Sequence, residues 1–151
     1  VLSINLSARL LHDDDFARRM LERLDEGRIQ GDRLILEISE DSLETDLRAA
    51  VRVLQELKQR GVRIALDDFG AGQARLLELL NVPPYAVKFD ISLIRDLDKL
   101  PRNRQEMIGL LVTLVKKGQT RALAEGVSHS GELAICRQLD FDLIQGFACG
   151  I

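Results

Sequence analysis

The sequence predicts an α/β fold in which parallel strands alternate with helices. Strand-like and helix-like segments follow one another along the whole chain, and parallel strands need helical crossovers of this kind. The strand-like segments are mainly apolar, and a polar residue lies at or near the C-terminal end of each. A barrel directs all its strand ends to one mouth, whereas an open doubly wound sheet uses them mainly at one switch point. We therefore favour a barrel over an open sheet. The polar residues concerned are Asn5, Glu37, Asp67, Asp68, Lys88, Glu125 and Gln145.

Six segments have the apolar character of strands: 1–6, 34–38, 62–66, 85–89, 121–124 and 143–147. Helices are expected between them at 13–26, 43–60, 74–80, 104–117 and 131–139. The helix at 43–60 has the clearest pattern, because leucines and an alanine recur along one face and Gly61 follows its end. The aspartates at 13–15 are expected to form a solvated helix start. A complete eight-stranded barrel takes roughly 250 residues, so we expect about two strand–helix units to precede Val1.

Composition narrows the function classes. The chain has 151 residues, with 21 Lys and Arg against 24 Asp and Glu, and 46% of its residues are hydrophobic. We expect one domain over residues 1–151, without an internal linker. The mixed charges and the 4% aromatic content argue against binding of polymeric nucleic acid. No apolar run approaches the roughly 20 residues that cross a bilayer, so no membrane contact is expected. Two cysteines form no disulfide framework, which favours the cytoplasm.

Carboxylate and amide oxygens that meet at one barrel mouth are suited to Mg²⁺ or Mn²⁺. Asn5, Glu37 and Asp67 can share one cation, and Asp67 can bridge to a second cation held with two further carboxylates, Asp68 and Glu125. Two such ions about 3.5–4 Å apart support in-line cleavage of a phosphodiester. The strand ends also carry Lys88, which can orient or polarise the attacking water, and Gln145, which can position a water or a substrate oxygen.

Each of these residues also has an ordinary structural explanation. Glu37 or Glu125 can be satisfied by an arginine or a backbone group, and Lys88 can form a structural ion pair or serve as a Schiff-base nucleophile. The joint pattern favours the metal site, since so many carboxylates repel one another without cations. His12 and His129 are too isolated for a metal site and are interpreted as surface or packing residues.

The motifs of this sequence resemble those of the bacterial EAL domain, in order and spacing, over essentially the whole chain. The EAL domain is a cyclic di-GMP phosphodiesterase on a modified TIM (β/α)8 barrel. The matching motifs are Ser-Ile-Asn-Leu-Ser at 3–7, Leu-Glu-Ile-Ser-Glu at 36–40, Ala-Leu-Asp-Asp-Phe-Gly at 65–70, Val-Lys-Phe-Asp at 87–90, Ala-Glu-Gly-Val at 124–127 and Gln-Gly-Phe at 145–147.

The resemblance implies hydrolysis of cyclic di-GMP to linear pGpG with Mg²⁺ or Mn²⁺. By position it implies that Lys88 acts on the catalytic water, that Gln145 lies near substrate and metals, and that Glu40 anchors the loop after Asp68. It also implies flanking sensory or signalling domains and allows a homodimer. The metal ligands implied are Asn5, Glu37, Asp67, Asp68 and Glu125.

Three departures from the family pattern bear on activity, and the altered loop and Ser128 motivate an alternative. The Glu-Ala-Leu signature lies outside this sequence, and Ala71 with Gly72-Gln73-Ala74-Arg75 replaces a loop that usually carries hydroxyl groups. Ser128-His129 replaces the usual Glu-Thr, which removes one carboxylate near the mouth. The alternative is a catalytically weak or inactive EAL-type receptor for cyclic di-GMP, or a protein-interaction module. A purely structural dimerisation barrel and a Schiff-base aldolase fit the acidic residues less well.

Overall fold

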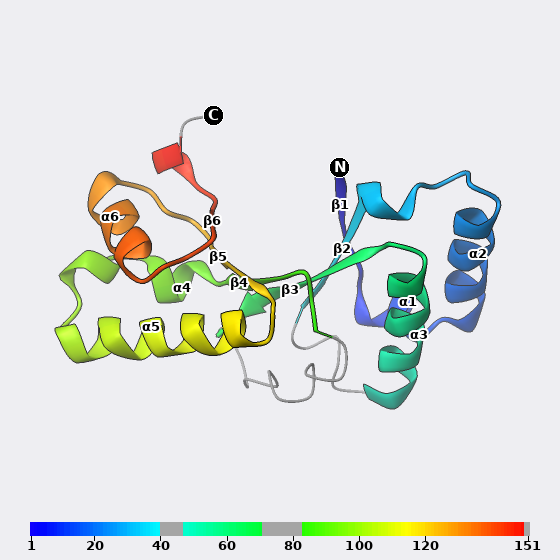
Figure 1. Cartoon of the computed structure of the whole chain (residues 1–151), viewed down its shortest axis with the longest axis horizontal. Helices are drawn as coiled ribbons and strands as arrows, with labels where there is room; N and C mark the ends of the chain where they lie inside the picture. The colour runs from blue at the N-terminus through cyan, green and yellow to red at the C-terminus, as the bar shows by residue number, and fades with distance from the viewer. Residues whose placement is uncertain (40–46, 71–82, 150–151) are drawn as a thin grey trace. The chain divides into compact units, whose positions relative to one another are not determined.

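The computed structural model describes residues 1–39, 47–70 and 83–149. The chain divides into two units, residues 1–67 with 74–84 and residues 68–73 with 85–151. Within each unit, consecutive strands pair in chain order and helices connect them (Figure 1). The described ranges hold six strands, which is the number that the sequence predicts.

The first unit pairs β1 (Leu2–Asn5), β2 (Leu34–Ser39) and β3 (Arg63–Phe69) in parallel, although the last two residues of β3 belong to the second unit. Its helices are α1 (Ala8–Leu11), α2 (Asp14–Asp25) and α3 (Leu47–Gln59), and a 3₁₀ turn, η1 (Gly31–Arg33), precedes β2. The predicted start of α2 is confirmed, because Asp13 caps it. Its Oδ1 accepts hydrogen bonds from the backbone N–H groups of Asp15 at 2.9 Å and Phe16 at 3.1 Å.

Two periodicities build the core of this unit. In β2 every second residue is buried, which leaves Glu37 among the half-buried residues of the other face. In α3 the predicted apolar face supplies Leu54 and Leu57, both fully buried. The bidentate ion pair of Arg60 and Asp25, with N–O distances of 2.6 and 3.0 Å, links the end of α3 to the end of α2.

The second unit pairs β4 (Ala86–Phe89), β5 (Arg121–Ala124) and β6 (Leu143–Ile144) in parallel. Its helices are α4 (Ile91–Ile94), α5 (Arg102–Lys117) and α6 (Ser130–Gln138), with 3₁₀ turns η4 (Leu97–Lys99) and η5 (Phe147–Cys149). All four residues of β4 are buried, as is typical of a parallel strand covered on both faces. At its end, the ring of Phe89 packs edge-on against Phe69 and Phe141, with centroids 5.1 and 5.0 Å apart.

Several predicted boundaries are wrong. β3 continues through Asp67 and Asp68 to Phe69, so both aspartates belong to the strand. β6 ends at Ile144, because Gly146 has a φ of +147°, and a Cβ there would collide with the carbonyl oxygen of Val127. The short α4 and the 3₁₀ turns were not predicted. The expected helix at 74–80 and the expected start of the helix at 43 lie outside the described residues. None of the helices in the described ranges is both long and apolar enough to cross a membrane.

Candidate functional site

The polar face of the first unit gathers three of the residues that the sequence singles out. Strand register pairs Asn5 with Glu37 and Ser39 with Asp67. Because alternate residues of a strand share a face, Asn5, Glu37 and Asp67 lie on the same face of β1 to β3. Oε1 of Glu37 accepts a hydrogen bond from the hydroxyl of Ser3 at 2.5 Å. Carboxylate and amide oxygens are the ligand types that a hard divalent cation prefers.

The second unit brings Lys88 and Glu125 together. Nζ of Lys88, from β4, lies 2.8 Å from Oε1 of Glu125, which directly follows β5. The two side chains are 9% and 17% exposed, so solvent screens this ion pair far less than a surface pair. The backbone N–H of Glu125 donates to the carbonyl oxygen of Phe89 at 3.1 Å, which fixes the end of β5 beside β4.

Asp68 lies close to this ion pair. One of its carboxylate oxygens is within 4.8 Å of a carboxylate oxygen of Glu125. The φ angle of Asp68 is +56°, a left-handed conformation that residues other than glycine rarely adopt and that is often retained at functional sites. Two carboxylates at this separation beside one lysine fit a divalent cation, because its charge offsets their repulsion.

Gln145 follows β6 at the same end of the strands as Glu125. Its backbone N–H donates to the carbonyl oxygen of Ala124 at 2.9 Å, and its carbonyl oxygen accepts from Val127 at 3.1 Å. A cavity of about 270 Å³ opens beside the segments that follow β4, β5 and β6. It is lined by Ile91, Arg95, Gly126, Ser128, Gly146 and Phe147. The predicted loop anchor Glu40, and the loop residues 71–75, lie outside the described residues.

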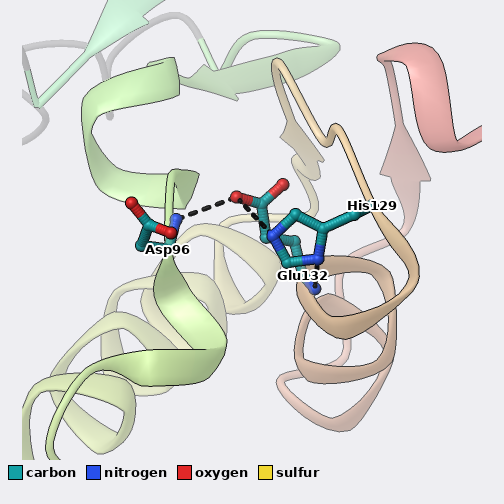
Figure 2. Close-up of side chains that lie close together, drawn as sticks. All are labelled: Asp96, His129 and Glu132. Atoms are coloured by element: carbon teal, nitrogen blue, oxygen red, sulfur yellow. Dashed lines mark hydrogen bonds and ion pairs between the residues drawn. The ribbon is translucent and has the colours of Figure 1, made fainter.

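Glu132 was not predicted as a functional residue, and its ionisable side chain is buried. Glu132 is 1% exposed, and Figure 2 shows its carboxylate between Asp96 and His129. Oε1 accepts the backbone N–H of Asp96 at 2.8 Å, and Oε2 accepts both the backbone N–H and the hydroxyl of Ser128, at 2.7 and 2.9 Å. Ser128 stands where the resemblance to the EAL domain implies a glutamate. Here a carboxylate from another position, that of Glu132, contacts residue 128.

Hydrogen bonding keeps Glu132 ionised. Burial alone would raise the pKa of Glu132. The backbone N–H groups of Ser128 and Asp96, the Ser128 hydroxyl and the nearby His129 together outweigh burial and lower this pKa to about 2. His129 caps α6 through Nδ1, which accepts the N–H groups of Gly131 at 3.2 Å and Glu132 at 3.4 Å. The spacing His129-x-x-Glu132, an N-cap residue followed by a glutamate at the third helical position, is the signal that could have indicated this arrangement.

Comparisons with known proteins identify the family. The EAL domain model matches residues 1–150. Cyclic di-GMP phosphodiesterase PdeR of Escherichia coli is 30% identical over 146 residues, which are 97% of this chain and 22% of PdeR. The solved structure of the PaMucR phosphodiesterase in complex with c-di-GMP is 28% identical, with a TM-score of 0.85 over 99% of this chain and 60% of that chain.

A further solved structure links the fold to a metal ion. Klebsiella pneumoniae BlrP1, in a complex with manganese and cyclic di-GMP, is 28% identical, with a TM-score of 0.83 over 97% of this chain and 37% of that chain. The chain spans about a fifth of the length of the curated relatives it matches. These likenesses confirm the predicted α/β fold class of the modified TIM-barrel type. The chain belongs to the EAL domain family.

Proposed function

We propose that this chain hydrolyses one phosphodiester bond of cyclic di-GMP to give linear pGpG, with Mg²⁺ or Mn²⁺ as cofactor. The observation that carries the proposal is the shielded ion pair of Lys88 and Glu125 beside Asp68, in a member of the EAL family. The names of relatives, among them PdeR and NbdA, support this substrate, and the BlrP1 complex supports a divalent metal.

Each unit carries oxygen ligands of its own for a cation. Asn5, Glu37 and Asp67 would hold one cation, and Asp68 and Glu125 would hold another. When bound, such ions lower the pKa of a coordinated water and offset charge on the phosphate.

Lys88 supplies a fixed positive charge at the end of β4. Its Nζ donates to the attacking water and holds the water oxygen toward phosphorus, while Gln145 positions a water or a substrate oxygen. The water loses one proton as its oxygen forms the new bond to phosphorus, the bond from phosphorus to the 3′ oxygen breaks, and that oxygen takes up a proton. One water is thereby added for each pGpG formed.

The wider setting of the site is part of the same proposal. Residues 1–151 would act as one EAL-type domain, with Glu40 anchoring the loop after Asp68, within a bacterial signalling protein that has flanking domains and forms a homodimer. The free thiols of Cys136 and Cys149 suit the reducing cytoplasm.

The test is chromatography of cyclic di-GMP after incubation with the purified protein and Mn²⁺. Lys88→Met removes the charge and keeps most of the volume, and we expect it to lower kcat by about 100-fold. Lys117→Met, which changes an exposed lysine of α5, should leave turnover unchanged. pGpG formation by Lys88→Met at the wild-type rate would show that Lys88 does not act on the water. Binding of cyclic di-GMP without turnover by the wild type would favour the receptor, the alternative that the Ser128-His129 replacement motivates.

A further inference from the structure

Glu132 connects two loops that follow neighbouring strands. Asp96, whose N–H binds Oε1, follows α4 and so belongs to the segment that continues from β4. Ser128, which binds Oε2 through its N–H and its hydroxyl, lies in the loop between β5 and α6. The carboxylate therefore joins these two loops directly, and we refer to its bonds to Asp96 and Ser128 as the Glu132 bridge.

The bridged loops carry the ion pair of the proposed site. Lys88 lies near the end of β4, and Glu125 lies three residues before Ser128. The two loops also meet at Gly126, which has a φ of +68°, and a Cβ there would collide with the side chain of Ile91. The loops thus touch next to Glu125 and are bonded to each other again at Glu132. A shift of one loop would change the distance between Lys88 and Glu125.

The backbone at Asp96 depends on the same bridge. Its φ is +56°, a left-handed conformation that is unfavourable for a residue with a Cβ. The N–H of this strained residue is the one that Oε1 accepts, while its own carboxylate pairs with Lys99 at 2.5 Å. Loss of the bridge would release Asp96 toward a more relaxed conformation.

The ring of His129 lies beside the bridge. Because Nδ1 accepts two backbone N–H groups, the neutral ring carries its proton on Nε2. Nε2 lies 3.4 Å from Oε1 of Glu132 and 3.9 Å from Oδ1 of Asp98, a buried oxygen that has no hydrogen-bond partner among the residues that the structure describes. With its proton on Nε2 the ring has no lone pair left for a metal, and the contacts of Glu132 in this arrangement go to the two loops.

We infer that Glu132 is a positioning residue, whose carboxylate keeps the loops after β4 and β5 in register and thereby keeps Lys88 paired with Glu125. This role in catalysis rests on the proposed phosphodiesterase function.

The test compares Glu132→Gln with the wild type by two independent readouts. A glutamine keeps the size of the side chain, but its NH₂ group must face one of the N–H donors of Asp96 or Ser128. The first readout is acylation of Lys88 by acetic anhydride, measured by mass spectrometry against the exposed Lys117. We expect Lys88 labelling to rise about tenfold, since a loosened loop opens more often. The second readout is steady-state turnover, in which we expect kcat to fall about tenfold while KM changes little.

Two further variants serve as controls. Glu106→Gln makes the same chemical change at an exposed glutamate of α5 and should alter neither readout. Ser128→Ala removes only the hydroxyl bond of the bridge and should raise Lys88 labelling by a smaller factor, which keeps the inference testable if Glu132→Gln does not fold.

Unchanged Lys88 labelling in folded Glu132→Gln, or in Ser128→Ala where the glutamine variant does not fold, would overturn the inference. Increased labelling with an unchanged kcat would overturn the positioning role, because a purely stabilising residue behaves in that way. Absence of turnover in the wild type would refute the proposed function and the catalytic role together. The labelling result would still decide whether the Glu132 bridge holds the ion pair.

Discussion

The lowered pKa of Glu132 predicts that the free energy of unfolding of this chain falls measurably as the pH is lowered. Its pKa is about 2 in the folded chain, against an ordinary value of 4.5. A pKa that is lowered by folding stabilises the native state above the unfolded value, and the stabilisation disappears as the pH falls through the folded value. The difference corresponds to roughly 3 kcal/mol near neutral pH, of which about 2 kcal/mol is lost by pH 3.

Urea unfolding followed by far-UV circular dichroism measures this effect. Wild type and Glu132→Gln are compared at several pH values between 7 and 3. Other carboxylates also lose stabilisation in acid, among them Asp142, whose pKa is raised by burial but lowered overall by the N–H of Ala122 and by Lys116. They contribute equally to both proteins and cancel in the difference. The stability difference between the two proteins should therefore shrink as the pH falls. A difference that stays constant from pH 7 to pH 3 would refute the assigned ionisation of Glu132.

The remaining predictions concern one glycine and the two thiols. Gly146→Ala should lower the free energy of unfolding by more than about 1 kcal/mol, because of the positive φ and the collision with Val127. Thermal melts measure it. Gly109→Ala in α5, where the added Cβ would meet only the end of the Leu139 side chain at 3.2 Å, should lower Tm by less than Gly146→Ala does. Equal Tm values for both variants would contradict the assigned backbone. Exposed Cys149 should react at once with a thiol reagent. Buried Cys136, whose pKa burial raises to about 11, should react only on unfolding, so two fast thiols in the native chain would count against this packing.

Local pattern explains why parts of this fold were predictable. The strand at 121–124 and the helix at 104–117 follow from short-range periodicity, and the structure places them at Arg121–Ala124 and Arg102–Lys117. The end of β6 could not be predicted in the same way, because it depends on Val127, which is distant in the sequence from Gly146. The roles of the predicted metal ligands stay predictions, although the strands bring Asn5 beside Glu37 and Asp68 close to Glu125.

Hydrogen bonds between residues far apart in the sequence could not be predicted at the site. Glu132 looks like an ordinary charged residue in the first turn of a helix, and its N–H donor at Asp96 lies 36 positions away. The sequence predicts a surface or packing role for His129. Its ring is half-buried and also caps α6. Only the three-dimensional arrangement shows that these residues share one hydrogen-bond network.

The edge-on contact of Phe69 with Phe89 has a consequence for how this domain can diverge. Phe69 directly follows Asp68 and Phe89 directly follows Lys88, so the contact between the two buried rings holds the backbone next to both charged residues. The spacing of the two charged groups therefore depends on an apolar contact between their neighbours in the chain. A substitution that changes the size of either buried ring can therefore alter the chemistry of the site while every charged residue is retained.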